Sequence, residues 1–130
     1  MIELGNCLVT GAAGFLGSHL VRGLLEEGYP VRAVIRNTPL ELEHPNLEIV
    51  RGTVEDADRM REVCEGIDTV FHTVAQLSLL GGKAASESYR RSAYAANVEG
   101  VENLSAACIA HGVPRLIHTS SVDVCFNSEV

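Results

Sequence analysis

The chain has no tryptophan, a single lysine (Lys83) and only ten basic residues against 17 acidic ones. Its formal net charge of −7 argues against a nucleic-acid partner or an anionic membrane surface, because both require a basic face. The four cysteines form no C-x-x-C pair, and no cysteine–histidine spacing suits zinc, so we expect no metal site. No apolar run approaches the ~20 residues of a membrane-spanning helix, and no signal-peptide pattern opens the chain. We therefore expect a cytoplasmic chain without a membrane segment.

The composition is that of a globular protein, with 46% hydrophobic and 21% charged residues. A length of 130 residues suits one domain, which we assign to residues 1–130. The cysteines are interpreted as small buried residues in a reducing compartment.

Short apolar segments alternate with segments of helical spacing along the whole chain. The predicted strands are residues 7–10, 30–36, 47–51, 69–73 and 115–119, and the predicted helices are 15–27, 56–65 and about 89–111. Gly28, Gly66 and Gly112 follow the helices, as is common at helix ends. This alternation predicts right-handed crossovers and a parallel sheet covered on both faces. The predicted fold class is therefore α/β, a Rossmann-type doubly wound sheet with strand order 3-2-1-4-5.

A glycine turn, Thr10-Gly-Ala-Ala-Gly-Phe-Leu-Gly17, joins the first strand to the first helix. This G-x-x-G-x-x-G spacing is one variant of the dinucleotide fingerprint. Gly11 would allow the tight turn, Gly14 would let the backbone approach the pyrophosphate, and Gly17 would let the helix pack closely on the sheet. The turn predicts a cofactor pyrophosphate at the helix N-terminus. The alternative interpretation is a structural turn without a ligand.

The end of the second strand bears on the choice of cofactor. An acidic residue commonly binds the adenosine ribose hydroxyls at this place, but Ile35 stands there, followed by Arg36. Isoleucine cannot accept a hydrogen bond, whereas arginine can pair with a 2′-phosphate. We therefore predict NADP(H) as the cofactor, with NAD(H) as the alternative.

Four segments together resemble the extended short-chain dehydrogenase/reductase superfamily. They are Thr10–Gly17, Asp68-Thr-Val-Phe-His-Thr-Val-Ala75, Asn97-Val-Glu-Gly-Val-Glu-Asn-Leu104 and His118-Thr-Ser-Ser121. Within the superfamily, the stretch from Phe71 through Gly81-Gly82 and Tyr89-Arg-Arg-Ser to Asn97 is most similar to 3β-hydroxysteroid dehydrogenases. The resemblance covers the whole chain.

The resemblance implies roles for individual residues. It implies pyrophosphate contacts by Gly11, Gly14, Phe15 and Leu16. It places Thr53 and Val54 along the adenine. It places Val74, Ala75 and Gln76 on the path to the nicotinamide ribose. It implies that Asn97 holds a helix irregularity and a water near the active site. It also implies that Ser121 is the catalytic serine.

The sequence departs from the family pattern at three places. Ile35 and Thr53 stand where the family commonly has acidic residues. The catalytic Tyr-x-x-x-Lys is absent, because Leu79 lies four residues before Lys83, the single lysine. In the family this motif follows the serine, so we interpret the chain as truncated after the fifth strand. Residues 1–130 alone are therefore predicted to be inactive.

The leading hypothesis is the cofactor-binding half of an oxidoreductase of 3β-hydroxysteroid dehydrogenase type. Such an enzyme transfers hydride between nicotinamide and a hydrophobic secondary alcohol or ketone. The apolar loop Leu77-Ser-Leu-Leu80 favours such a substrate, although the loop could instead pack on the core. An NADPH-dependent carbonyl reductase similar to dihydroflavonol reductases is one alternative, and a non-catalytic dinucleotide sensor is another. The apolar fifth strand, if it is an open edge, predicts a homo-oligomer or aggregation.

Overall fold

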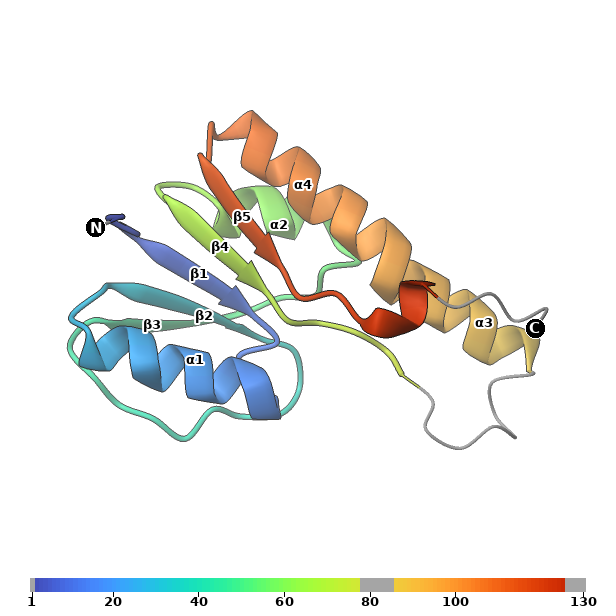
Figure 1. Cartoon of the computed structure of the whole chain (residues 1–130), viewed down its shortest axis with the longest axis horizontal. Coiled ribbons are helices and arrows are strands. Elements are labelled where there is room, and N and C mark those ends of the chain that lie inside the picture. The colour runs from blue at the N-terminus through green and yellow to red at the C-terminus, as the bar shows by residue number, and fades with distance from the viewer. Residues whose placement is uncertain (1, 78–85, 126–130) are drawn as a thin grey trace.

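A five-stranded parallel sheet lies between two layers of helices (Figure 1). The protein's structure is a computed structural model that describes residues 2–77 and 86–125. The strands are β1 (Cys7–Thr10), β2 (Val31–Ile35), β3 (Leu47–Arg51), β4 (Thr69–His72) and β5 (Arg115–His118). The sheet order β3-β2-β1-β4-β5 confirms the predicted α/β fold and the predicted 3-2-1-4-5 order. The bounds of β2, β4 and β5 differ from the prediction by one residue, at both ends of β2 and at the carboxyl ends of β4 and β5.

The helices divide between the two faces of the sheet. They are α1 (Phe15–Glu26), α2 (Ala57–Val63), α3 (Glu87–Tyr94), α4 (Gly100–Ala110), the π-helical segment η1 (Ala95–Glu99) and the 3-10 turn η2 (Val122–Cys125). Helix α1 covers one face, and α2 and α4 pack together on the other (Figure 1).

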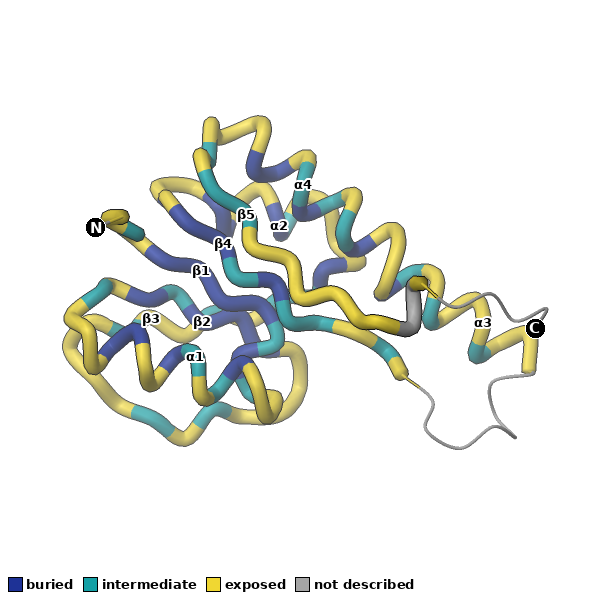
Figure 2. Tube along the Cα trace, viewed as in Figure 1, coloured by how far each residue is buried: buried dark blue, intermediate teal, exposed yellow. Residues whose placement is uncertain are grey.

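Alternating side chains of the strands fill a separate core on each face. Leu8 belongs to the core beneath α2 and α4, whereas its neighbours Cys7 and Val9 belong to the core beneath α1. The buried residues follow β1, β2 and β4, and the edge strands β3 and β5 are more exposed (Figure 2). The central strands therefore have a fixed register at their carboxyl ends, where the glycine turn begins.

The ends of the helices follow local chemistry. Gly28, with φ at +88°, lies just beyond α1, and Gly66 and Gly112 adopt positive φ after α2 and α4. The side chain of Asp56 caps α2 by accepting a hydrogen bond from the Arg59 amide at 3.0 Å. The prediction that glycines end these three helices is thus confirmed at all three positions.

The last predicted helix is not one regular helix. It begins at Glu87, two residues earlier than predicted, because the Ser86 hydroxyl accepts a hydrogen bond from the Tyr89 amide at 3.2 Å. It then passes through the π-helical η1 before α4. The predicted helix over 89–111 is therefore interrupted in its middle, and Asn97 lies inside this segment, where the resemblance implied a helix irregularity.

Three of the four cysteines are buried, but Cys125 is exposed in η2, so the expectation of four buried thiols is wrong for this residue. Across residues 2–77 and 86–125, no three His, Cys, Asp or Glu side chains are grouped so as to hold a metal ion. Within the same ranges no helix has the length and apolarity needed to cross a membrane. The predicted substrate-facing segment beyond Leu77, with the Gly81–Gly82 pair, lies outside the described residues.

Candidate cofactor-binding site

A cleft of about 430 Å³ opens at the carboxyl ends of the first four strands. The helix after β1 covers one face of the sheet, and the helices after β4 cover the other. Such a reversal between adjacent strands is where open α/β sheets bind ligands. The cleft is lined by residues 10–14, 34–38, 52–55 and 73–76, together with Ala96.

The glycine turn forms the floor of the cleft. Gly11 has φ at +66°, and a Cβ there would stand 2.7 Å from the Thr73 hydroxyl oxygen. A Cβ on Gly17 would overlap the Gly11 carbonyl group. At Gly14 a Cβ would meet only the Gly11 carbonyl oxygen, at 3.2 Å. Gly11 and Gly17 are therefore required by close contacts within the fold. Gly14 instead leaves the backbone of the turn open towards the cleft.

The first turn of α1 offers amide groups to an anion. Gly14 caps the helix without a side chain, so no side-chain oxygen occupies the first N–H groups. These amides have no acceptor within the helix, and the helix dipole favours a negative charge beside them. The turn therefore fits a pyrophosphate in the manner of other dinucleotide-binding helices.

Two predicted pyrophosphate contacts lie away from this cleft. Phe15 is 87% exposed and Leu16 is 45% exposed, and neither side chain lines the cleft. Gly17 also lies behind the turn rather than in the cleft lining. Any contact from Phe15 or Leu16 to a pyrophosphate would therefore come from the backbone amides.

Thr73 holds the ends of β1 and β4 together beneath the cleft. Its hydroxyl donates to the Thr10 carbonyl oxygen at 2.7 Å, and its amide donates to the Thr10 hydroxyl at 3.3 Å. These bonds fix the distance between the glycine turn and the loop that follows β4. The sequence interpretation gave no role to Thr73, although its position directly after a strand opposite Gly11 was a usable signal.

The end of the cleft that follows β2 and β3 has no carboxylate at positions 35 and 53, where acidic residues were expected. Ile35 is buried in the core beneath α1, and Arg36 and Thr53 both line the cleft beside Val54. Glu55 also lines the cleft. The structure therefore brings Arg36, Thr53 and Val54 together in the lining of one cleft.

The opposite end of the cleft is formed by the loop after β4. Val74, Ala75 and Gln76 all line the cleft. The Asn97 side chain makes two hydrogen bonds to the backbone of Gln76. It accepts from the Gln76 backbone N–H at 2.8 Å and donates to the Gln76 backbone carbonyl oxygen at 2.9 Å. The Ser92 hydroxyl donates to the Gln76 side-chain oxygen at 2.8 Å. Asn97 thus acts on the cleft through Gln76, a contact that spacing alone did not reveal.

Ser121 lies just after β5, at the same end of the sheet as the cleft, but it is not part of the cleft lining. Directly after β5, the Thr119 amide donates to the His72 carbonyl oxygen at 3.1 Å. The serine is therefore carried to the carboxyl edge of the sheet beside β4.

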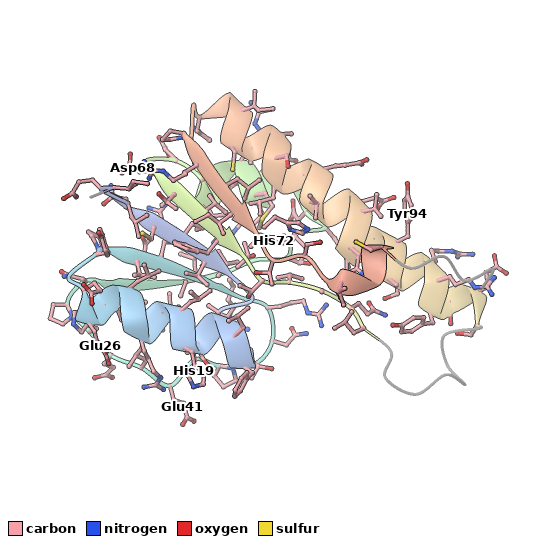
Figure 3. All side chains as sticks on the ribbon, in the orientation of Figure 1. His19, Glu26, Glu41, Asp68, His72 and Tyr94 are labelled. Atoms are coloured by element: carbon pink, nitrogen blue, oxygen red, sulfur yellow. The ribbon has the colours of Figure 1, made fainter. Side chains whose placement is uncertain are left out.

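His72 of β4 lies in the interior of the sheet (Figure 3). His118 of β5 is its partner in the strand pairing and is exposed. Their rings are stacked, with centroids 5.3 Å apart. Burial, with a smaller effect from His118, lowers the pKa of His72 to about 4. His72 is therefore a neutral core residue and not a proton carrier at neutral pH.

Comparison with known proteins identifies a family and several relatives of this chain. Residues 7–127 match the NAD dependent epimerase/dehydratase family. The chain is 44% identical over 127 residues to a 3β-hydroxysteroid dehydrogenase/Δ5→4-isomerase of Mycobacterium tuberculosis, covering 98% of this chain and 34% of that protein. It is 40% identical over 117 residues to a 2-alkyl-3-oxoalkanoate reductase of Stenotrophomonas maltophilia, covering 90% of this chain and 33% of that protein.

A solved structure that contains a bound cofactor is similar in fold. The WbmH enzyme of Bordetella bronchiseptica in complex with NAD+ superposes with a TM-score of 0.72 at 26% identity, over 88% of this chain and 38% of that one. The chain thus spans about a third of the length of the curated relatives it matches.

Proposed function

The chain belongs to the NAD dependent epimerase/dehydratase family, and on this premise we propose that it is the dinucleotide-binding part of an NAD(P)-dependent oxidoreductase. The observation that carries the proposal is the cleft at the carboxyl ends of β1 to β4, with Gly11 and Gly14 in its floor. The first turn of α1 would hold the pyrophosphate. Val54 and Gln76 would flank the adenosine and nicotinamide ends.

Binding of the cofactor tests this proposal directly. Titration of NADH and NADPH into the chain, followed by nicotinamide fluorescence and calorimetry, should show saturable binding at one site. Gly14→Val should abolish it, because a branched side chain would fill the approach to the open backbone of the turn. A chain that binds neither dinucleotide would contradict the proposal.

We propose further that the reaction is of 3β-hydroxysteroid dehydrogenase type, on a hydrophobic secondary alcohol or ketone. The 44% identity to the mycobacterial protein of that name supports this choice. A bound nicotinamide would accept or supply the hydride. Ser121 would hydrogen-bond the substrate oxygen and stabilise charge on it. The alcohol proton needs a separate base, since a serine hydroxyl is a poor one.

Residues 1–130 should therefore bind cofactor without turning over an alcohol. The coding sequence beyond Val130 provides the test, since a Tyr-x-x-x-Lys encoded there would supply the base. The longer protein should then oxidise 3β-hydroxysteroids in a substrate panel that also contains nucleotide sugars. Activity on nucleotide sugars alone would favour a sugar epimerase instead. Turnover of a 3β-hydroxysteroid by residues 1–130, abolished by Ser121→Ala, would refute the proposal that these residues alone are inactive.

A carbonyl reductase of dihydroflavonol-reductase type is the second candidate. Its specific support is the adenosine end of the cleft, where Arg36 is present and Ile35 replaces an acid. This arrangement favours NADPH and thus the reductive direction. A non-catalytic dinucleotide sensor would be favoured instead if no Tyr-x-x-x-Lys follows Val130.

A further inference from the structure

Two asparagines on one continuous helical run reach loops at opposite ends of the cleft. Asn97, in η1, makes two hydrogen bonds to the backbone of Gln76, at 2.8 and 2.9 Å. Asn103, in α4, donates from Nδ2 to the Val54 carbonyl oxygen at 3.0 Å. Val54 and Gln76 both line the cleft, whereas Asn97 and Asn103 do not.

The Asn103 contact is reinforced by close packing of the helix on the same residue. A Cβ on Gly100 would stand 2.6 Å from Cγ2 of Val54 and 3.1 Å from its Cβ, so the helix backbone touches this loop directly. The Val54 side chain is 4% exposed and belongs to the core beneath α2 and α4. Its side chain is thus fixed by packing, and its carbonyl by Asn103.

The neighbours of Val54 are the residues that face a ligand. Thr53 and Glu55 both line the cleft on either side of it. The Asp56 amide donates to the Thr53 carbonyl oxygen at 3.0 Å, which closes a tight turn around Val54. Rotation of the Val54 peptide would therefore move Thr53 and Glu55 together.

We propose that Asn103 is a positioning residue for the adenosine half of the cleft, acting through Val54. The inference rests on the proposed dinucleotide binding. Asn97, which the resemblance already places near the active site, holds Gln76 at the other end of the cleft and serves as the comparison. Asn103 itself lies outside the cleft lining and would act without touching the ligand.

The separation between the halves makes the roles measurable. ADP carries the adenosine and the pyrophosphate but no nicotinamide ribose, so it probes one end of the cleft alone. Asn103→Ala should weaken ADP and NAD(P)H by the same factor, about fivefold to tenfold for one lost hydrogen bond. Asn97→Ala should weaken NAD(P)H by about as much and leave the Kd of ADP unchanged.

Glu102→Gln is the matched control, because Glu102 is exposed on α4 next to Asn103 and does not line the cleft. Asn103→Asp is the second variant, since it preserves shape and replaces the donor amide with an acceptor. Circular dichroism and thermal unfolding would measure the folded fraction of each variant. A purely structural role would weaken both ligands equally in both alanine variants.

The outcomes separate the inference from the proposed function. A wild-type chain that binds neither ADP nor NAD(P)H would overturn both. If the wild-type chain binds both ligands, unchanged Kd values in the folded Asn103 variants would overturn the inference alone. So would a loss of ADP binding in Asn97→Ala equal to its loss of NAD(P)H binding.

Discussion

The imidazole Nδ1 of His72 and the hydroxyl of Thr10 share a hydrogen bond of 2.7 Å between β4 and β1, directly before the glycine turn. His72 is 1% exposed, and within the described part of the chain its Nε2 atom has no hydrogen-bond partner. A charged imidazole here would lack both water and a counter-ion. Burial therefore keeps His72 neutral, and in this state its Nδ1 and the Thr10 hydroxyl join the two strands of the cleft.

Stability should consequently fall in mild acid. The pKa of His72 is about 4 in the folded chain, against 6.5 for an ordinary histidine. Below pH 6.5 the unfolded chain binds a proton that the folded chain does not, so stability is lost as the pH falls towards 4. Between pH 7.5 and 5 this residue should cost about 2 kcal/mol of unfolding free energy. Urea unfolding at the two pH values measures it.

His72→Gln should remove that part of the pH dependence, since glutamine does not titrate and can still bond to Thr10. Equal pH dependence in the wild type and His72→Gln would show that other groups cause the acid sensitivity.

Gly17→Ala should damage both folding and cofactor binding. The added Cβ would overlap the backbone carbonyl of Gly11, which cannot move without displacing the turn. We expect a loss of about 2 kcal/mol in unfolding free energy and a weaker Kd for NAD(P)H, measured by urea unfolding and by titration.

Gly23→Ala is the matched control on the same helix. A Cβ at Gly23 meets no atom within 4 Å, so this change should stabilise α1 by up to about 1 kcal/mol. Similar destabilisation by both substitutions would mean that close packing at Gly17 does not explain its presence.

The sequence was sufficient for features that depend on local chemistry. The strand order follows from alternating strands and helices, and positive φ at Gly11 follows from a turn at a strand end. The irregular segment η1 was implied by the family resemblance at Asn97 but not by spacing, because a regular helix and a π segment share the same apolar residues. The bonds from Asn97 to Gln76 and from Asn103 to Val54 join residues 21 and 49 positions apart, so they depend on tertiary packing.

The β5 edge should make the isolated chain self-associate. In the described part of the structure β5 pairs only with β4, and Ile117 on it is 42% exposed. Apolar edge strands recruit other chains, and lysine on the edge opposes this. Sedimentation of the 130-residue chain should show dimers or larger species that Ile117→Lys reduces. Ile109→Lys, on the exposed surface of α4, should not reduce them. If the chain remains monomeric at high concentration, β5 does not mediate self-association.

The choice between NAD(H) and NADP(H) should depend on Ile35 and Arg36. A carboxylate at position 35 would bind the 2′- and 3′-hydroxyls of NAD(H) and repel a 2′-phosphate. Isoleucine does neither, and Arg36 lines the cleft where the phosphate would lie. A charge-assisted bond from this exposed arginine should favour NADP(H) by about tenfold. The preference should shrink at high salt, because exposed charges are screened.

The double variant Ile35→Asp/Arg36→Ala should reverse this preference, and titration of both cofactors into each protein measures it. Arg22→Ala removes the same charge from an exposed position on α1 outside the cleft, so it should leave the Kd ratio unchanged. The acidic net charge of −7 and the nearby Glu55 oppose a 2′-phosphate, so any preference for NADP(H) must come from the local position of Arg36. Equal affinities in the wild type, or tighter NAD(H), would show that Arg36 is only a solvated charge at the end of β2.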